Sequence, residues 1–367
     1  MGNSGSSPTP IRIPVMRPLL PRQAELAPYL RNIDESRTYT NFGPLHRRLE
    51  ARLAEYFGVR EDEVLLLANG TLALQGAVET AKSGKGAWLM PSWTFVASAE
   101  AVSSAGREIL FGDVDPATWR LRMADSPVGQ PCLVVAPFGD APDLSLFRSR
   151  TAENPVVVDA ASCFDASKGL TSSDLSNGMV MVSLHATKLV TTGEGGVLVG
   201  DAQWINDVKR WSNFGFRGRR IADVRGTNAK LSEYSAAVGL ASLDRWSSTR
   251  SELSERATRY RNLLREARVG VQPALDRGHY TSTLIAHFAN AYDRDRVREA
   301  LTGAGIETRA WWSEGVHRMS TFAECQRRER LIVTDHLAST TLGLPFFVDM
   351  TASEIDHVCE VVARALT

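Results

Sequence analysis

The strongest constraint on the fold of this chain of 367 residues is a series of short, almost uninterrupted apolar runs. The runs cover residues 64–67, 87–90, 108–111, 132–136, 156–158, 179–184 and 196–199. Strands that are buried on both faces have this pattern, because neither side of the strand meets water. Helical spacing of apolar residues between the runs, as at 72–81 and 95–105, implies parallel pairing. The pattern predicts an α/β fold in which a mostly parallel central sheet is sandwiched by helices.

The remaining segments extend this fold at both ends of the chain. Residues 1–10 are rich in Gly, Ser and Pro, and we expect them to form a flexible tail. Helical spacing predicts helices at 22–36, 44–57, 231–246 and 251–267. Further on, we expect strands at 282–288, 306–309 and 341–344, helices at 294–304 and 352–366, and an amphipathic stretch at 321–333. The chain should therefore form a large domain at 11–248 and a smaller C-terminal α+β domain at 249–367.

The composition of the chain indicates which kinds of partner and which cellular compartment to expect. The 42 Lys and Arg residues balance 42 Asp and Glu residues, so no overall positive field exists to attract nucleic acid or an anionic membrane. No apolar stretch reaches the length of a membrane span. The four cysteines are too widely spaced for a metal cluster or a disulfide framework, which fits a reducing compartment. We expect a cytoplasmic protein with no nucleic-acid partner, no membrane partner and no metal.

Chemically useful residues follow five of the predicted strands. The segments are Asn69-Gly70-Thr71, Ser92-Trp93-Thr94-Phe95, Pro137-Phe138-Gly139, Asp159-Ala160-Ala161-Ser162, and the stretch from Ser183 to Lys188. Ligands of open α/β sheets bind at the carboxyl ends of the strands. We therefore expect these hydroxyl groups, aromatic rings, one carboxylate and one amine to meet in one site.

Each of these residues has an ordinary structural interpretation beside the functional one. Gly70 and Thr71 at the start of a helix could hold a phosphate, although a plain threonine N-cap gives the same residues. Asp159 at the mouth of a buried strand needs a partner, which could be a helix end or a protonated ring nitrogen. Phe95 or Trp93 could stack on a planar ring or belong to the core.

Lys188 lies in a loop of small and hydroxyl residues between two apolar runs. Alone, it could be a solvated lysine in a glycine-rich turn, or a desolvated amine nucleophile with a lowered pKa. Together the residues have one economical interpretation. Lys188 would hold an aldehyde, Asp159 a pyridinium nitrogen, and Thr71 and Ser183 a phosphate, which describes a site for pyridoxal 5'-phosphate.

The order and spacing of these motifs resemble the sugar aminotransferases of the DegT/DnrJ/EryC1/StrS family. The matching segments are Asn69 to Leu74, Pro91 to Phe95, Asp159 to Ser162, Ser183 to Lys188 with Gly193 to Gly196, Gly226 to Glu233, and Leu344 to Phe346. The similarity runs from about residue 10 to the end of the chain. It implies the architecture of fold type I of the PLP-dependent transferases, in the aspartate aminotransferase superfamily.

The resemblance also implies a role for each matching residue. Lys188 would bind the aldehyde and move a proton between the substrate carbon and C4′ of the cofactor, and Asp159 would keep the pyridine nitrogen protonated. Phe95 would stack on the ring, and Gly70, Thr71 and Ser183 would hold the phosphate. Asn228 resembles the family residue that reaches the phosphate from the neighbouring subunit, which implies a homodimer with shared active sites.

Some positions leave their role open. Ser162 stands where many members carry Gln or His near the 3-oxygen of the ring, and Asn69 replaces a common serine. The candidate substrate contacts are Phe42, Trp93, Arg217, Arg219, Lys230 and His317. For the cations the alternative is a solvated basic loop, and for His317 it is a structural histidine.

The implied reaction has two halves. L-Glutamate would donate its amino group, leaving pyridoxamine 5'-phosphate as the intermediate form of the cofactor. That form would aminate C3 or C4 of a nucleotide-linked deoxy-ketosugar in deoxyaminosugar biosynthesis. The alternatives are an aminotransferase acting on an amino-cyclitol ketone, or a catalytically inactive binding or regulatory relative. Relatives that remove oxygen have histidine at the lysine position, so Lys188 favours transamination.

Overall fold

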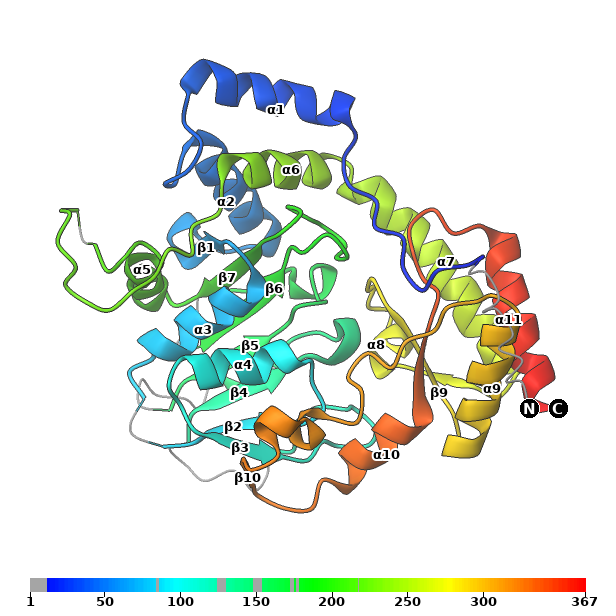
Figure 1. Ribbon diagram of the computed structural model, residues 1–367. Helices are drawn as coiled ribbons and strands as arrows, with labels where there is room; N and C mark the ends of the chain where they lie inside the picture. The colour runs from blue at the N-terminus through cyan, green and yellow to red at the C-terminus, as the bar shows by residue number, and fades with distance from the viewer. Residues whose placement is uncertain are drawn as a thin grey trace, which may run out of the picture.

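The computed structural model describes residues 12–83, 86–123, 130–147, 154–171, 175, 178–216 and 218–367. The flexible tail predicted at residues 1–10 lies outside the described residues. Within these residues the chain forms one sheet of eight strands and another of three, and the larger sheet is covered by helices (Figure 1).

The larger sheet has the strand order β1-β7-β6-β5-β4-β2-β3-β10. Its strands are β1 (Val64–Leu67), β2 (Trp88–Pro91), β3 (Ile109–Gly112), β4 (Cys132–Val135), β5 (Val156–Asp159), β6 (Gly178–Ser183), β7 (Gly196–Gly200) and β10 (Gln326–Arg327). β7 is antiparallel to both of its neighbours, and the other recorded pairings are parallel. The predicted mostly parallel central sheet is confirmed.

Helices bury both faces of this sheet. One face packs on α3 (Gly70–Thr80), α4 (Val96–Ser104) and α5 (Ala202–Trp211), and the other on α2 (Pro44–Phe57) and α6 (Glu233–Asp244). The helix α1 (Gln23–Ser36) lies along the outer side of α6 (Figure 1). Alternate strand residues divide between the two cores, as Leu65 and Leu66 do. Burial on both sides explains why the strands are apolar at nearly every position.

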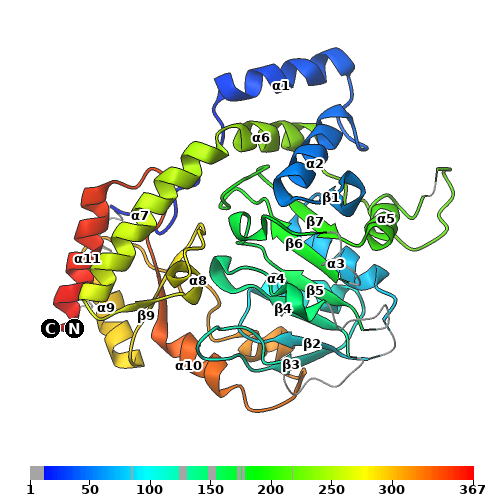
Figure 2. The same ribbon diagram turned by 180° about the vertical axis from the view of Figure 1, so that it is seen from behind.

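The rest of the chain builds the three-stranded antiparallel sheet and its helices. Its elements are α7 (Trp246–Glu266), β8 (Gly270–Val271), α8 (Pro273–Asp276), β9 (Leu284–His287), α9 (Ala291–Gly303), α10 (Ile332–Thr340), β11 (Thr341–Leu344) and α11 (Ala352–Leu366). The helix α7 extends from α6 to the side of α11 (Figure 2). The predicted boundary between residues 248 and 249 falls in the first turn of α7, and the division into two domains stays a prediction.

Short 3₁₀ turns complete the described chain. They are η1 (Glu61–Glu63), η2 (Pro137–Gly139), η3 (Leu144–Leu146), η4 (Asp165–Ser167), η6 (Val316–Arg318) and η7 (Ser320–Phe322). Among the helices of the described residues, none is long and apolar enough to cross a membrane.

One expected element is wrong, one expected stretch is divided among several elements, and one helix was not expected. The strand predicted at 306–309 is wrong, because Ile306 bridges Ile13 while Arg309 bridges Gly343, and neither bridge extends into a ladder. The amphipathic stretch predicted at 321–333 contains η7, β10 and the start of α10. The helix α5 is additional, although Trp204, Ile205 and Val208 have the helical spacing that would predict it.

Candidate active site

A cavity of about 460 Å³ lies at the carboxyl ends of five strands of the larger sheet. Residues from all five predicted strand-end segments line it, and they include Gly70, Thr71, Thr94, Phe95, Phe138, Asp159, Ser162, Ser183 and Lys188. The opposite side is formed by Met16, Thr283, Arg309, Trp311 and Trp312. The cavity therefore lies between the larger sheet and segments associated with the smaller one.

The turn from β1 into α3 forms a cradle of backbone amides. The side chain of Asn69 accepts a hydrogen bond from the Leu72 amide at 2.8 Å. The preceding amides, of Gly70 and Thr71, belong to the first turn, where a helix offers no internal acceptor. Gly196 lies against this turn, and a Cβ added at that position would be 2.8 Å from the Gly70 Cα. The close approach of two glycines leaves the amides open to an anion, and a phosphate suits such a helix end.

Asp159 ends β5 and is 6% exposed. Its carboxylate accepts hydrogen bonds from the Ser98 hydroxyl at 2.6 Å and the Ala161 amide at 3.1 Å. Burial raises the pKa of Asp159 above its ordinary value, while these two bonds and the nearby Lys188 charge act in the opposite direction. A buried carboxylate in this setting favours a cationic partner such as a protonated ring nitrogen.

Lys188 follows β6 in a loop that hydrogen bonds hold closed. Its backbone amide donates to the His185 carbonyl at 2.8 Å, and its side-chain amine donates to the Ser162 hydroxyl at 3.0 Å. Burial lowers the pKa of Lys188, and the charge of Asp159 opposes this shift. A lysine with a lowered pKa has a larger neutral fraction, which is the nucleophilic form.

Aromatic rings border the cavity on two sides. Phe95 precedes the first turn of α4 and is 55% exposed, which is unusual for a phenylalanine beside a folded core. Across the cavity, Phe138 stacks on Trp312, with 3.8 Å between the ring centroids. An exposed aromatic face at the cavity wall offers a surface for a planar ligand.

None of the predicted substrate contacts in the described residues lines this cavity, and three of them have other packing partners. Trp93 is 2% exposed and packs edge-on against Trp312 behind the cavity wall. Phe42 packs edge-on against His46, and the amine of Lys209 lies 5.0 Å from the centroid of the Phe42 ring.

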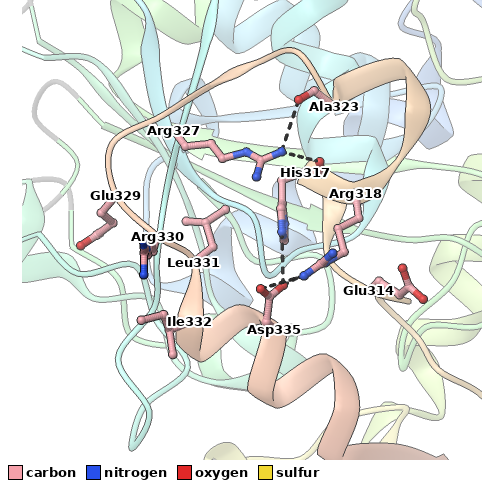
Figure 3. Close-up of a pocket in the computed structure, with 10 residues that line it drawn as sticks. All are labelled: Glu314, His317, Arg318, Ala323, Arg327, Glu329, Arg330, Leu331, Ile332 and Asp335. Atoms are coloured by element: carbon pink, nitrogen blue, oxygen red, sulfur yellow. Dashed lines mark hydrogen bonds and ion pairs between the residues drawn. The ribbon is translucent and has the colours of Figure 1, made fainter.

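His317 is the third of these predicted contacts, and it is 2% exposed. Its Nδ1 lies 2.6 Å from the Ser92 hydroxyl and its Nε2 lies 3.3 Å from the Asp335 carboxylate. Figure 3 shows the ring directed at Asp335 in a separate pocket that Arg318 and Arg327 also line. Burial lowers the pKa of His317, and Asp335 opposes this shift.

The remaining predicted contacts come from the segment between α5 and α6. This loop projects beyond α5 in both views (Figures 1 and 2). Asn228 and Arg219 are exposed on it, and neither lines the Lys188 cavity of its own chain. The Lys230 amine lies 4.6 Å from the Phe214 ring, and burial lowers its pKa. Arg217 lies outside the described residues.

Several residues that shape the site were missing from the sequence-based set. Ser98 is fully buried and relays a hydrogen bond from Thr94, 2.7 Å away, to Asp159. The sequence feature that could have identified Ser98 is its position in the first turn of the helix after Phe95. The bridge between Arg309 and Gly343 brings Arg309 and Trp311 to the cavity. No local sequence pattern predicts that contact.

The assembled groups fit pyridoxal 5'-phosphate part by part. Open helix amides with two hydroxyl groups suit its phosphate, the Lys188 amine suits its aldehyde, and Asp159 suits its ring nitrogen. Such a set can accept and return protons at a carbon next to nitrogen.

Comparisons with known proteins agree with this chemistry. Residues 22–363 match the profile described as the DegT/DnrJ/EryC1/StrS aminotransferase family. The protein named Mb3436c from Mycobacterium bovis is 32% identical, over 98% of this chain and 92% of its own. A dTDP-4-amino-4,6-dideoxy-D-glucose transaminase from Shigella dysenteriae is 27% identical, over 95% and 97% of the two chains. The crystal structure of DesI, determined in the presence of its TDP-sugar product, is similar with a TM-score of 0.86 and 29% identity, over 99% and 95%.

Proposed function

The chain belongs to the DegT/DnrJ/EryC1/StrS aminotransferase family of PLP-dependent enzymes, and from this premise we propose that it aminates a nucleotide-linked deoxy-ketosugar. L-Glutamate is the amino donor in this proposal, and the acceptor is the keto carbon at C3 or C4 of the sugar. The observation that supports it most directly is the convergence of Lys188, Asp159 and the first turn of α3 on one cavity.

The residues of the chain divide the work between binding and proton transfer. When bound, pyridoxal phosphate supplies an aldehyde and an electron-withdrawing ring. The amides of Gly70 and Thr71 bind its phosphate, and Asp159 holds the ring nitrogen in its protonated form. The free amine of Lys188 takes a proton from the substrate carbon and returns it during transfer.

The hydroxyl groups of Ser162 and Ser98 form hydrogen bonds with Lys188 and Asp159, respectively. The Ser162 hydroxyl accepts from the Lys188 amine at 3.0 Å and so fixes its direction inside the cavity. The Ser98 hydroxyl donates to Asp159 and favours the ionised carboxylate, which is the form that binds a cation. Phe95 offers its exposed face to the ring of the cofactor.

A dTDP-linked sugar is the first acceptor to test. The support is the dTDP-sugar activity named for the Shigella dysenteriae relative and the TDP-sugar product named for DesI. We further propose a homodimer with shared sites, since Asn228 is exposed in the segment between α5 and α6. In this arrangement Asn228 would contact the phosphate bound by the neighbouring subunit.

The test is amino transfer from L-glutamate to a panel of ketones, followed as 2-oxoglutarate formation. The panel contains a dTDP-linked 4-keto-6-deoxyhexose, a 3-keto isomer, a UDP-linked ketosugar and an amino-cyclitol ketone. Turnover of a nucleotide-linked ketosugar, lost in Lys188→Ala, is the expected result. Turnover of the cyclitol ketone alone would assign the other substrate class, and turnover of none by PLP-loaded protein would contradict the proposal.

A further inference from the structure

The turn that follows β4 carries a backbone conformation that requires support. Phe138 has φ 47° and ψ 43°, and Gly139 has φ 93°. Left-handed backbone is unfavourable for a residue with a side chain, and it persists where neighbouring groups fix it. The Phe138 ring is 5% exposed, lines the Lys188 cavity and stacks on Trp312 with an angle of 21° between the planes. The strained residue is thus part of the cavity wall.

Asp140, two residues later, is a buried carboxylate held by two arginines. Its side chain is 1% exposed. It accepts hydrogen bonds from Arg120 Nε at 2.7 Å and from Arg277 Nε at 3.2 Å. Arg120 follows β3 of the larger sheet, whereas Arg277 directly follows α8 beside the smaller sheet. A buried charge is tolerated when it is paired in this way, and its pairing joins both sides of the cavity.

A second contact fixes the same turn from the side of the smaller sheet. A Cβ added to Gly139 would be 2.5 Å from the Thr281 Cβ, so the Gly139 backbone packs closely against the Thr281 side chain. The hydroxyl groups of Thr281 and Thr283 lie 3.3 Å apart, and Thr283 lines the cavity. The turn therefore touches the opposite side at Arg277, at Thr281 and, through Phe138, at Trp312.

We propose that Asp140 is a positioning residue for the acceptor substrate. By binding Arg120 and Arg277 together, it holds Phe138 against Trp312 as an aromatic wall of the cavity. The apolar C–H face of the deoxysugar packs on this wall, so the wall contributes binding free energy that the sugar keeps in the transition state. This role rests on the proposed function, because it concerns the same acceptor. Asp140 itself touches neither substrate nor cofactor, since it lies behind the wall.

The experiment compares Asp140→Asn with Asp143→Asn. Asp143 is a matched control, because it lies on the same segment and 3.9 Å from Arg120, but is 40% exposed. At saturating L-glutamate, Asp140→Asn should raise the KM for the dTDP-linked 4-keto-6-deoxyhexose about tenfold and leave kcat nearly unchanged. Its near-UV circular dichroism should weaken as the stacked rings loosen, while PLP affinity stays that of the wild type. Asp143→Asn should match the wild type in every measurement.

Arg277→Gln provides a second variant if Asp140→Asn does not fold. It removes one of the two guanidinium partners and should shift KM and the near-UV signal in the same direction. A soluble variant of either residue with wild-type KM and wild-type near-UV signal would overturn the inference, as would a loss confined to kcat. If PLP-loaded wild type turns over no ketone, the proposed function fails instead. The near-UV comparison then still tests whether Asp140 holds the wall.

Discussion

Burial acts in the same way on Lys188 and Asp159, the two groups proposed to bind the aldehyde and the ring nitrogen of the cofactor. Burial disfavours the charged form of each residue, and the charge of each favours ionisation of the other. Burial still penalises the charged carboxylate of Asp159, so a further cation beside it would stabilise the ionised form. A protonated ring nitrogen supplies one, so the pair is complementary to a group that carries both an aldehyde and a basic ring.

Ser98 gives this account a test by pH. Its hydroxyl binds the ionised form of Asp159, so removing it raises a pKa that burial has already raised. On acidification of Ser98→Ala, Asp159 should gain its proton earlier, and the loss of bound PLP should move to higher pH by about one unit. The measurement is the visible absorbance of bound PLP against pH.

Ser103→Ala is the control for this substitution, because Ser103 is an exposed residue of the same helix, α4. Its profile should coincide with that of the wild type. An unchanged profile in Ser98→Ala, or a shift to lower pH, would show that Asp159 does not control retention of the cofactor.

At the scale of elements, the β1–α3 turn depends on its contact with β7. Gly196→Ala would place a Cβ 2.8 Å from backbone atoms of Gly70, and backbone cannot yield as a side-chain end can. Overpacking of this kind costs about 1–3 kcal/mol, so PLP affinity should fall about tenfold and thermal stability should decrease. An absorbance titration with PLP and a thermal unfolding curve measure both effects.

Gly303→Ala is the matched control. Gly303 is the last residue of α9, and a Cβ added there meets nothing within 4 Å. This variant should keep the wild-type PLP affinity and unfold at the same temperature or slightly higher. Wild-type PLP affinity in Gly196→Ala would mean that the amide cradle is not the phosphate site.

The strands of the larger sheet could be predicted because a strand that is buried on both faces appears in the sequence as a continuous apolar run. The runs predicted at 64–67, 156–158 and 179–184 became β1, β5 and β6, each within one residue of the expected bounds. By contrast, α10 begins at Ile332, which is 67% exposed, and its first turn is capped by Asp113 from β3's carboxyl end. That cap joins residues far apart in the chain, so the local spacing of apolar residues could not predict it.

The candidate site likewise contains residues that could be predicted from the sequence and residues that could not. Groups that follow strands could be predicted, because all parallel strands present their carboxyl ends at one edge. The wall of Phe138 and Trp312, and the position of Arg309, depend on how the second sheet packs against the first. His317 has a similar origin: its side chain bonds Ser92 and Asp335 from two distant segments, and this arrangement is formed only in the folded chain.

For the whole molecule, the cavity joins three separate parts of the chain. Strand ends form one side, and residues 309–312 form the other. The N-terminal segment adds Met16, and the neighbouring Val15 amide donates to the Glu307 carboxylate at 3.0 Å. The N-terminal segment is therefore part of the cavity wall.

Sharing of sites between subunits can be tested by mixing two inactive variants. Lys188→Ala removes the amine, and Asn228→Asp puts a negative charge where the proposal places a neighbour's phosphate. In a mixed dimer one site would combine both changes, and the other would have neither. Random exchange of subunits should restore about a quarter of wild-type activity. Each variant unfolded and refolded alone serves as the control, and a mixture no more active than its components would contradict shared sites.

The central claim is that Lys188 is the amine through which pyridoxal phosphate acts, and a single-turnover absorbance measurement tests it most directly. PLP-loaded wild type should be yellow, and L-glutamate should discharge the colour with about one 2-oxoglutarate released per site. With L-glutamate, Lys188→Ala should show neither the loss of colour nor the release of 2-oxoglutarate at a comparable rate. Lys168→Ala, which changes an exposed lysine, should behave as wild type. A wild-type protein that stays colourless with PLP, or a Lys188→Ala variant that releases 2-oxoglutarate at the wild-type rate, would contradict the account.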